Sequence, residues 1–89
     1  MKNSIYAMFR ISKYSSVKGI SYLSGDFAPV EDYHCHHITP KNKGGTNDFE
    51  NLCVLSVAEH AILHSSNPEN LYEMFPKKHK RIKFLIEKL

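Results

Sequence analysis

Three apolar segments separated by polar turns predict short strands. Residues 20–23 and 52–55 are almost wholly apolar. Residues 33–38 are a third strand candidate, which Thr39-Pro40 would end because proline cannot donate a hydrogen bond to a sheet. The polar run Ser24-Gly25-Asp26 would end the first strand. We therefore expect short strands of four to six residues.

Other stretches predict a loop and helices. Residues 41–51 hold two glycines, three asparagines and an aspartate, a composition typical of a loop. The apolar positions of residues 5–14 fit a short helix roughly, and a strand stays open there. Ser56 can cap a helix that ends at Asn67-Pro68, with Glu59 completing a reciprocal capping box.

Two further helices follow. Asn67 and Pro68 suit the cap and the first position of one of them. The last begins near Pro76, and its apolar positions recur at helical spacing opposite a set of lysines: Ile82, Leu85, Ile86 and Leu89. The order of the central unit is thus strand, loop, strand and helix.

Length and composition predict one globular domain over residues 1–89. Apolar residues make up 42% and charged residues 24% of the chain, which excludes collagen-like and disordered classes. No apolar run reaches the roughly 18 residues of a membrane span, and Arg10 and Lys13 interrupt any N-terminal signal sequence. Cys35 and Cys53 belong to no Cys-x-x-Cys pair, which excludes a disulfide scaffold and a four-cysteine zinc knuckle. We expect a reducing, cytoplasmic location, with the two thiols packed as small apolar groups.

The net charge of +3 is concentrated near the C-terminus. Five of the 12 basic residues fall within seven positions: Lys77, Lys78, Lys80, Arg81 and Lys83. Such a run indicates either contact with a polyanion or a solvated helix face, and both interpretations stay open.

Five of the six histidines lie between positions 34 and 64. His60 and His64 are four residues apart in the predicted helix, so both imidazoles share one face and can bind one metal ion. By itself such a pair is more often solvated than metal-bound. His36 and His37 are adjacent on a predicted strand and therefore point to opposite sides. His36 could complete a metal site with open coordination positions, as a catalytic metal requires, while His37 acts as an acid or base.

The full register is more specific. The chain reads His36-His37-x-x-Pro40-x-x-x-Gly44-Gly45-x5-Asn51-x8-His60-x-x-x-His64, eight fixed residues over 29 positions. This pattern resembles the signature of HNH nucleases. The resemblance implies an α+β protein with a ββα-metal (His-Me finger) core: a two-stranded antiparallel hairpin, a long loop and a metal-binding helix, here with flanking helices.

The resemblance also implies roles for the matched positions. His36, His60 and His64 correspond to the metal ligands, and His37 corresponds to the general base. Asn51, counted with His37 in the catalytic site, would tie the loop so that His37 is held in place. The implied activity is metal-dependent hydrolysis of DNA, as an endonuclease or nickase that leaves 3′-hydroxyl and 5′-phosphate ends. The implied cofactor is one divalent ion, Mg²⁺ or Mn²⁺ in catalysis, with Zn²⁺ or Ni²⁺ also able to bind.

DNA is the expected partner. Lys41 and Lys43 lie in the loop next to His37, where phosphates would pass, and the basic run from Lys77 to Lys83 could bind the backbone further along. Tyr22-Leu23-Ser24-Gly25, Cys35-His36-His37 and Gly44-Gly45-Thr46 resemble the endonuclease module of group II intron-encoded reverse transcriptases. That likeness suggests a reverse transcriptase or an intron RNA complex as a further partner.

Alternatives stay open. A non-catalytic zinc-binding nucleic-acid module would keep the fold without turnover, and a purely structural interaction domain would bind neither metal nor DNA. His34 shares the face of His36 and could support the metal site or contact phosphate, whereas His79 is expected to be solvated. Unlike many HNH proteins, this chain has no paired cysteines around the hairpin. We therefore expect apolar packing by the last helix together with Tyr22, Leu23, Phe27, Leu52, Leu55 and Ile62.

Overall fold

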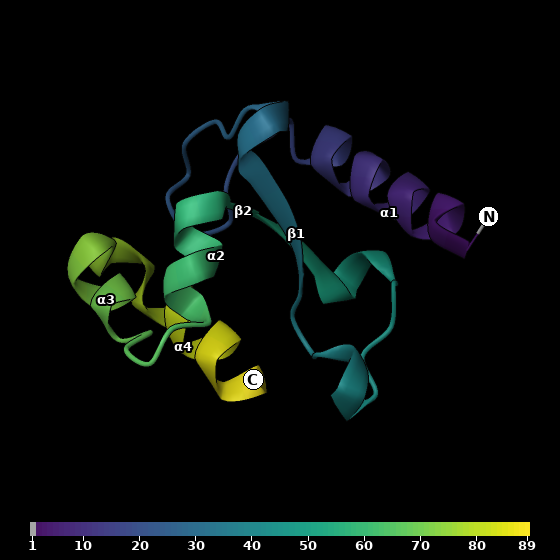
Figure 1. Ribbon diagram of the computed structural model, residues 1–89. Coiled ribbons are helices and arrows are strands. Elements are labelled where there is room, and N and C mark those ends of the chain that lie inside the picture. Colours follow the sequence, from purple (N-terminus) through teal and green to yellow (C-terminus); the bar gives the residue numbers. More distant parts are fainter. Residues whose placement is uncertain (1) are drawn as a thin grey trace.

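The computed structural model describes the backbone of residues 2–89 and the side chains of residues 7–89. Its centre is a two-stranded antiparallel sheet in which β1 (Tyr33–His37) pairs with β2 (Leu52–Ser56). Figure 1 shows α1 (Lys2–Ser16) on one side of this hairpin and the α-helices that follow β2 on the other. The protein is α+β, as predicted. Residues 5–14, for which the sequence allows either a helix or a strand, lie within helix α1.

The two faces of the hairpin belong to different apolar clusters. On the α1 side, Tyr33, Cys35, Leu52 and Val54 are buried with Ala28. On the other side, Ile38, Cys53 and Leu55 join buried side chains from the later helices: Leu63, Leu71, Ile82 and Leu85. Because side chains alternate across a strand, adjacent histidines of β1 face different surroundings.

The helix that follows β2 begins where the sequence predicts. Ser56 caps α2 (Val57–Leu63): its hydroxyl accepts from the backbone N–H of Glu59, and the Glu59 carboxylate accepts from the backbone N–H of Ser56. Glu59 is only 5% exposed, and it accepts a second, 2.5 Å hydrogen bond from the hydroxyl of Ser21. This buried carboxylate joins residue 21 to the first turn of α2 and so fixes the helix that carries His60.

The prediction of a strand at residues 20–23 is wrong. The structure has only an isolated bridge between Ile20 and Phe27, and residues 22–24 form a turn. The Ser21 hydroxyl accepts hydrogen bonds from the backbone N–H groups of Leu23 and Ser24, which gives the backbone an alternative to a ladder. Gly25 has a φ of 77°, so the predicted polar turn at this point is confirmed.

Two helix boundaries also differ from expectation. Helix α2 ends at Leu63 rather than near Asn67, and His64 occupies its C-cap position. Helix α3 (Asn70–Met74) begins after Pro68, in a turn where Leu71 donates to the carbonyl of Pro68. No side chain caps α3, so the predicted Asn67 cap is not formed.

The C-terminal helix matches its prediction closely. A single 3-10 turn (Pro76–Lys78) leads into α4 (His79–Lys88). Ile82 and Leu85 are fully buried, and Ile86 and Leu89 pack against the same cluster. This helix therefore shares one apolar cluster with α2 and with the β2 side chains Cys53 and Leu55.

Of the predicted hairpin-supporting side chains, one is misplaced. Leu23, Leu52 and Leu55 are buried and Tyr22 and Ile62 are partly buried, as predicted. Phe27 is 63% exposed, and in the same segment the side chains of Leu23 and Ala28 are buried instead. The thiols of Cys35 and Cys53 are buried in the two clusters, and burial raises the pKa of Cys53 to about 12. Both cysteines therefore pack as the small apolar groups expected from the sequence.

Across residues 2–89, no helix combines the length and the apolar character needed to cross a bilayer.

Candidate functional site

Three histidines from two elements converge beside the hairpin. His36 lies in β1, His60 lies in α2 and His64 caps that helix. Each offers one ring nitrogen, and these three atoms lie within 4.8 Å of one another. The ring centroids are 5.2 Å apart for His36 and His60, 5.3 Å for His36 and His64, and 4.6 Å for His60 and His64. The sequence prediction that one strand histidine meets both helix histidines is confirmed.

The chemistry of this cluster fits a metal ion. Nδ1 of His36 lies 3.2 Å from Nε2 of His60, close to the roughly 3 Å that separates two nitrogens about 2.0–2.1 Å from one ion. His36 is 3% exposed, and among the described residues nothing forms a hydrogen bond with its Nε2. His36 and His60 can supply neutral nitrogen ligands, while His64 is exposed and keeps one side of the cluster open to solvent.

Burial keeps two of these rings neutral. Burial first, and then the neighbouring His60, His64 and His37 rings, lower the pKa of His36 to about 3. Burial and the neighbours His64 and His34 lower the pKa of His60 to about 4. Because a metal binds the unprotonated nitrogen, no proton has to be displaced from these two rings at neutral pH.

His37 borders the same cluster but makes a different contact. A hollow of about 270 Å³ is lined by His37, the three converging histidines, Pro40 and Lys41. Nε2 of His37 lies 2.8 Å from Oδ1 of Asn47. A carbonyl oxygen can only accept, so in the neutral ring Nε2 carries the proton and Nδ1 the lone pair.

Asn47 was missed by sequence reasoning. It lies in the polar run Thr46-Asn47-Asp48, and its position relative to the histidines does not distinguish it from the other asparagines of the loop. The only available signal is its place in the loop that follows the strand of His37. The contact forms because the loop folds back over β1.

Asn51 holds that loop closed. Its Oδ1 accepts from the backbone N–H of Thr39 at 2.8 Å, and its amide donates to the carbonyls of Thr39 and Thr46 at 3.1 and 2.8 Å. The two bonds to Thr39 join the ends of the 39–51 loop, and the third ties Thr46 to Asn51. Asn51 thus closes the loop that carries Asn47, whose side chain contacts the His37 ring.

The two loop glycines serve different purposes. Gly44 has a φ of 89°, the left-handed conformation expected for a tight turn. Gly45 lies so close to Thr39 that a Cβ there would overlap the Thr39 carbonyl oxygen. The loop can therefore close only with glycine at position 45.

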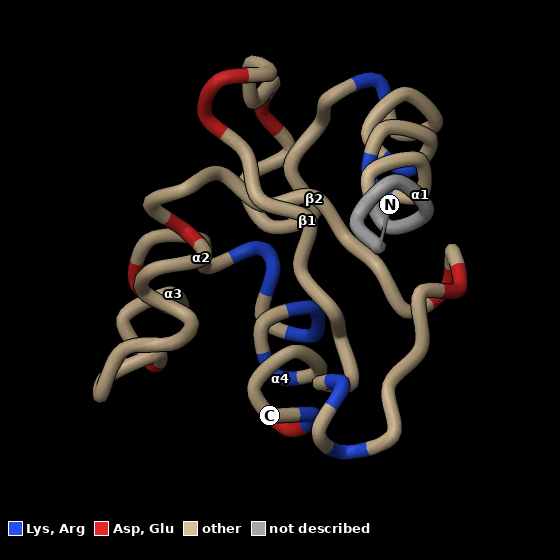
Figure 2. The backbone as a smooth tube through the Cα atoms, turned by 45° about the vertical axis from the view of Figure 1, so that its right-hand side comes forward, with Lys and Arg blue, Asp and Glu red and all other residues tan. Residues whose placement is uncertain are grey.

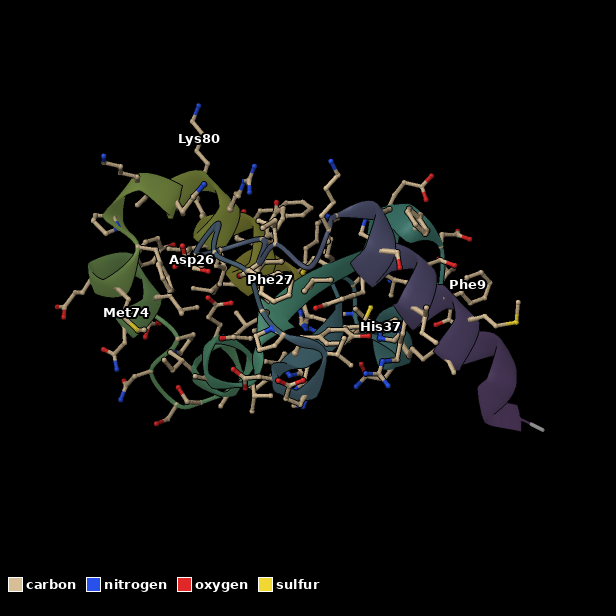
Figure 3. All side chains as sticks on the ribbon, turned by 90° about the horizontal axis from the view of Figure 1, so that it is seen from above. Phe9, Asp26, Phe27, His37, Met74 and Lys80 are labelled. Atoms are coloured by element: carbon tan, nitrogen blue, oxygen red, sulfur yellow. The ribbon has the colours of Figure 1, made fainter. Side chains whose placement is uncertain are left out.

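The basic residues divide into two groups. Lys41 lines the histidine hollow, and Lys43 donates a hydrogen bond to the carbonyl of Leu89 at the end of α4. Figure 2 shows this basic turn beside the C-terminal end of α4, along which further basic positions run. Figure 3 shows Lys80 projecting outward, away from His37. Arg81 donates to the Tyr22 carbonyl at 2.9 Å and lies over the Tyr22 ring, so part of its guanidinium is used within the protein.

The other two histidines lie where the sequence suggests. His34 is exposed on β1, and its Nδ1 is 2.8 Å from Nδ1 of His60. His79 is exposed on α4, with the Tyr72 ring 4.7 Å away.

Comparison with known protein families gives one match. The HNH endonuclease family model matches residues 24–65, which include β1, β2, α2 and every residue of the predicted signature. No curated protein and no solved structure matches the chain. The hairpin, loop and helix in this segment have the arrangement of the ββα-metal fold. Residues 24–65 therefore match the HNH endonuclease family in sequence and in fold, with three histidines placed to bind a metal ion.

Proposed function

We propose that this protein is a metal-dependent DNA endonuclease that nicks DNA by hydrolysing a phosphodiester bond. The observation that carries the proposal is that the adjacent residues His36 and His37 make different contacts. His36 meets His60 and His64 in a cluster that fits one metal ion, whereas His37 borders the same hollow and is held by Asn47. An attacking water and the phosphate charge each require a different group, and this arrangement provides both within one hollow.

His37 is proposed as the general base. In the neutral ring its Nε2–H donates to Asn47, and the lone pair on Nδ1 is proposed to take a proton from water. As that proton moves to Nδ1, the water oxygen bonds to phosphorus and the bond from phosphorus to the 3′ oxygen breaks. The 3′ oxygen takes up a proton from solvent water and His37 returns its proton to solvent, so the products are a 3′-hydroxyl and a 5′-phosphate.

His36, His60 and His64 are proposed to hold one divalent ion. When bound, that ion supplies Lewis-acid stabilisation of charge on the phosphate and the leaving oxygen. Three protein ligands leave coordination positions for phosphate oxygens, as a catalytic site needs. We propose Mg²⁺ or Mn²⁺ for turnover, with Zn²⁺ or Ni²⁺ binding more tightly to three imidazoles.

Lys41 and Lys43 are proposed to hold the DNA backbone next to the scissile phosphate. Lys41 lines the histidine hollow, and the contact between Lys43 and Leu89 places the basic turn against the end of α4. The basic residues earlier in α4 and before it would bind phosphates further along the duplex: Lys77, Lys78, Lys80, Arg81 and Lys83. Phosphate contacts of this kind position DNA without reading its sequence, so low intrinsic specificity is expected. A reverse transcriptase or intron RNA as a further partner rests only on sequence resemblance.

A plasmid assay tests the proposal. Supercoiled plasmid is incubated with wild-type protein and Mg²⁺, Mn²⁺, Zn²⁺ or Ni²⁺, and with the His37→Ala and His79→Ala variants purified in parallel. We expect nicked plasmid from the wild type and from His79→Ala, no product with EDTA, and a rate at least 100-fold lower for His37→Ala. Cleavage by His37→Ala at the wild-type rate would remove His37 as the base.

The same assay separates the alternative function. A non-catalytic zinc-binding nucleic-acid module would bind one Zn²⁺ per chain and retard DNA in a gel, yet leave the plasmid supercoiled with every metal. That result would reject the nuclease and keep the metal site. A chain that bound neither Zn²⁺ nor DNA would reject both functions and leave a structural interaction domain.

A further inference from the structure

His34 contacts the candidate metal site without belonging to it. It lies two residues before His36 on β1, and both side chains face α2. Its Nδ1 lies 2.8 Å from Nδ1 of His60, with the two rings nearly perpendicular at 86° and their centroids 5.0 Å apart. This distance is that of a hydrogen bond, which requires one proton shared between two otherwise identical nitrogens.

The proton can sit on either ring, and the choice affects the other side of His60. If His34 donates, the neutral His60 ring carries its own proton on Nε2, the atom that lies 3.2 Å from Nδ1 of His36. That proton would occupy the space between the two rings. If His60 donates from Nδ1 instead, Nε2 carries a lone pair that faces the site.

Only the second direction is compatible with a cation shared by His36 and His60. We infer that His34 is a positioning residue, which accepts the Nδ1–H of His60 and so presents the Nε2 lone pair of His60 to the metal. The inference rests on the proposed metal site and is independent of whether the chain cleaves DNA. It adds to the three predicted ligands a fourth histidine with a different task.

The size of the effect follows from the exposure of His34. Groups that orient a metal-bound histidine typically change metal affinity about 10- to 100-fold when removed. His34 is exposed, so water can partly replace it, and the lower end of that range applies. We therefore expect loss of His34 to raise the Kd for Zn²⁺ about tenfold.

Two variants and one control test the inference. His34→Ala removes the acceptor, whereas His34→Asn restores one, because the side-chain oxygen of asparagine is as many bonds from the backbone as Nδ1 of histidine. His79→Ala removes another exposed histidine outside the site. Zn²⁺ affinity is measured by competition with a chelating dye. Nitrogen-15 NMR of the Zn²⁺-loaded proteins identifies the protonated nitrogen of His60 and how fast its proton exchanges with water.

The expected pattern is specific. In the wild type, His60 carries its proton on Nδ1 and that proton exchanges slowly. In His34→Ala, the proton exchanges at least tenfold faster and the Kd for Zn²⁺ rises about tenfold. His34→Asn should return both values most of the way, and His79→Ala should change neither.

Two results would overturn the inference. Equal Zn²⁺ affinity and equal proton exchange in wild type and His34→Ala would show that His34 orients nothing, while leaving the metal site and the nuclease proposal intact. Coordination of His60 through Nδ1 would also reject it. If wild-type protein bound no Zn²⁺, the metal site itself would fail, and the proposed function would fail with it.

Discussion

Oδ1 of Asn47 lies 2.8 Å from Nε2 of His37, although the two residues are ten positions apart in the sequence. The contact fixes which nitrogen of His37 carries the proton and which way the ring points. A base that keeps its lone pair but loses this restraint spends less time aimed at its substrate water.

We therefore expect Asn47→Ala to lower the cleavage rate about 10- to 100-fold, part of what a positioned base contributes. Asn47→Asp keeps an acceptor oxygen and should lose less. The Kd for Zn²⁺ should be unchanged in both variants, because Asn47 does not touch the three converging rings. Single-turnover cleavage at saturating DNA measures the effect, and an undiminished rate in Asn47→Ala would contradict it.

A trade between stability and metal binding is expected at His36. Its buried Nε2 has no hydrogen-bond partner among the described residues, and such an atom costs about 1–3 kcal/mol. His36→Leu should therefore raise the free energy of unfolding of the metal-free protein by about 1 kcal/mol. It should also abolish the stabilisation by Zn²⁺, which for wild type is about 2.7 kcal/mol at 100 times the Kd.

Thermal unfolding with EDTA and with Zn²⁺ measures both effects of His36→Leu. The control is His79→Ala, in which the stabilisation by Zn²⁺ should be intact. A His36→Leu protein that still gained stability from Zn²⁺ at the wild-type concentration would exclude His36 as a ligand.

Acid should destabilise the metal-free protein well above the pH at which carboxylates are protonated. The lowered pKa values, about 3 for His36 and about 4 for His60, contrast with about 6.5 in an unfolded chain. Between these values the unfolded state binds more protons than the folded state, so the free energy of unfolding falls as the pH falls.

The slope should be about 1.4 kcal/mol per pH unit for each of the two histidines, over roughly pH 6 to 4. Urea unfolding in EDTA at several pH values measures it. His36→Leu removes one of the two groups and should show a shallower slope. The same slope in both proteins would mean that His36 is protonated as easily in the folded state as in the unfolded one.

Loop closure should tolerate alanine at one glycine better than at the other. Gly45→Ala forces a Cβ against the Thr39 carbonyl oxygen, whereas nothing lies within 4 Å of a Cβ at Gly44. Gly44→Ala should lower the free energy of unfolding by about 1 kcal/mol, because alanine must adopt the left-handed conformation there. We expect Gly45→Ala to lower the free energy of unfolding by more than Gly44→Ala does. It should also lower the cleavage rate, because the backbone of the loop held by Asn51 must move. Equal losses of stability in the two variants would contradict this account.

Lys41 and Lys80 should affect different steps. Lys41 lines the histidine hollow, and Lys80 projects from α4 away from His37. Lys41→Ala should lower the cleavage rate at saturating DNA, whereas Lys80→Ala should weaken binding alone. Each lost phosphate contact should reduce the dependence of log affinity on log salt by about 0.9. A Lys41→Ala protein with an unchanged rate at saturating DNA would place the scissile phosphate elsewhere.

Local sequence signals were enough to predict the elements of the site and its metal-ligand candidates. The capping box of Ser56 and Glu59, the apolar strand before it and the four-residue spacing of His60 and His64 are local signals, and all three are formed as predicted. Local signals suffice here because hydrogen bonds within a helix and alternation along a strand depend only on nearby residues.

Tertiary structure alone decided the contacts made across the loop and between elements. Ser21 falls within the strand predicted at residues 20–23. In the structure its hydroxyl donates to Glu59 and accepts from two backbone N–H groups of its own turn. Asn47 is an ordinary polar residue in the sequence, and for His34 the sequence leaves support of the metal site and phosphate contact both open. Folding brings Asn47 to within 2.8 Å of His37 and His34 to within 2.8 Å of His60. A hydrogen bond needs its partner at a defined distance and angle, and residues separated by ten or more positions reach that geometry only through the whole fold.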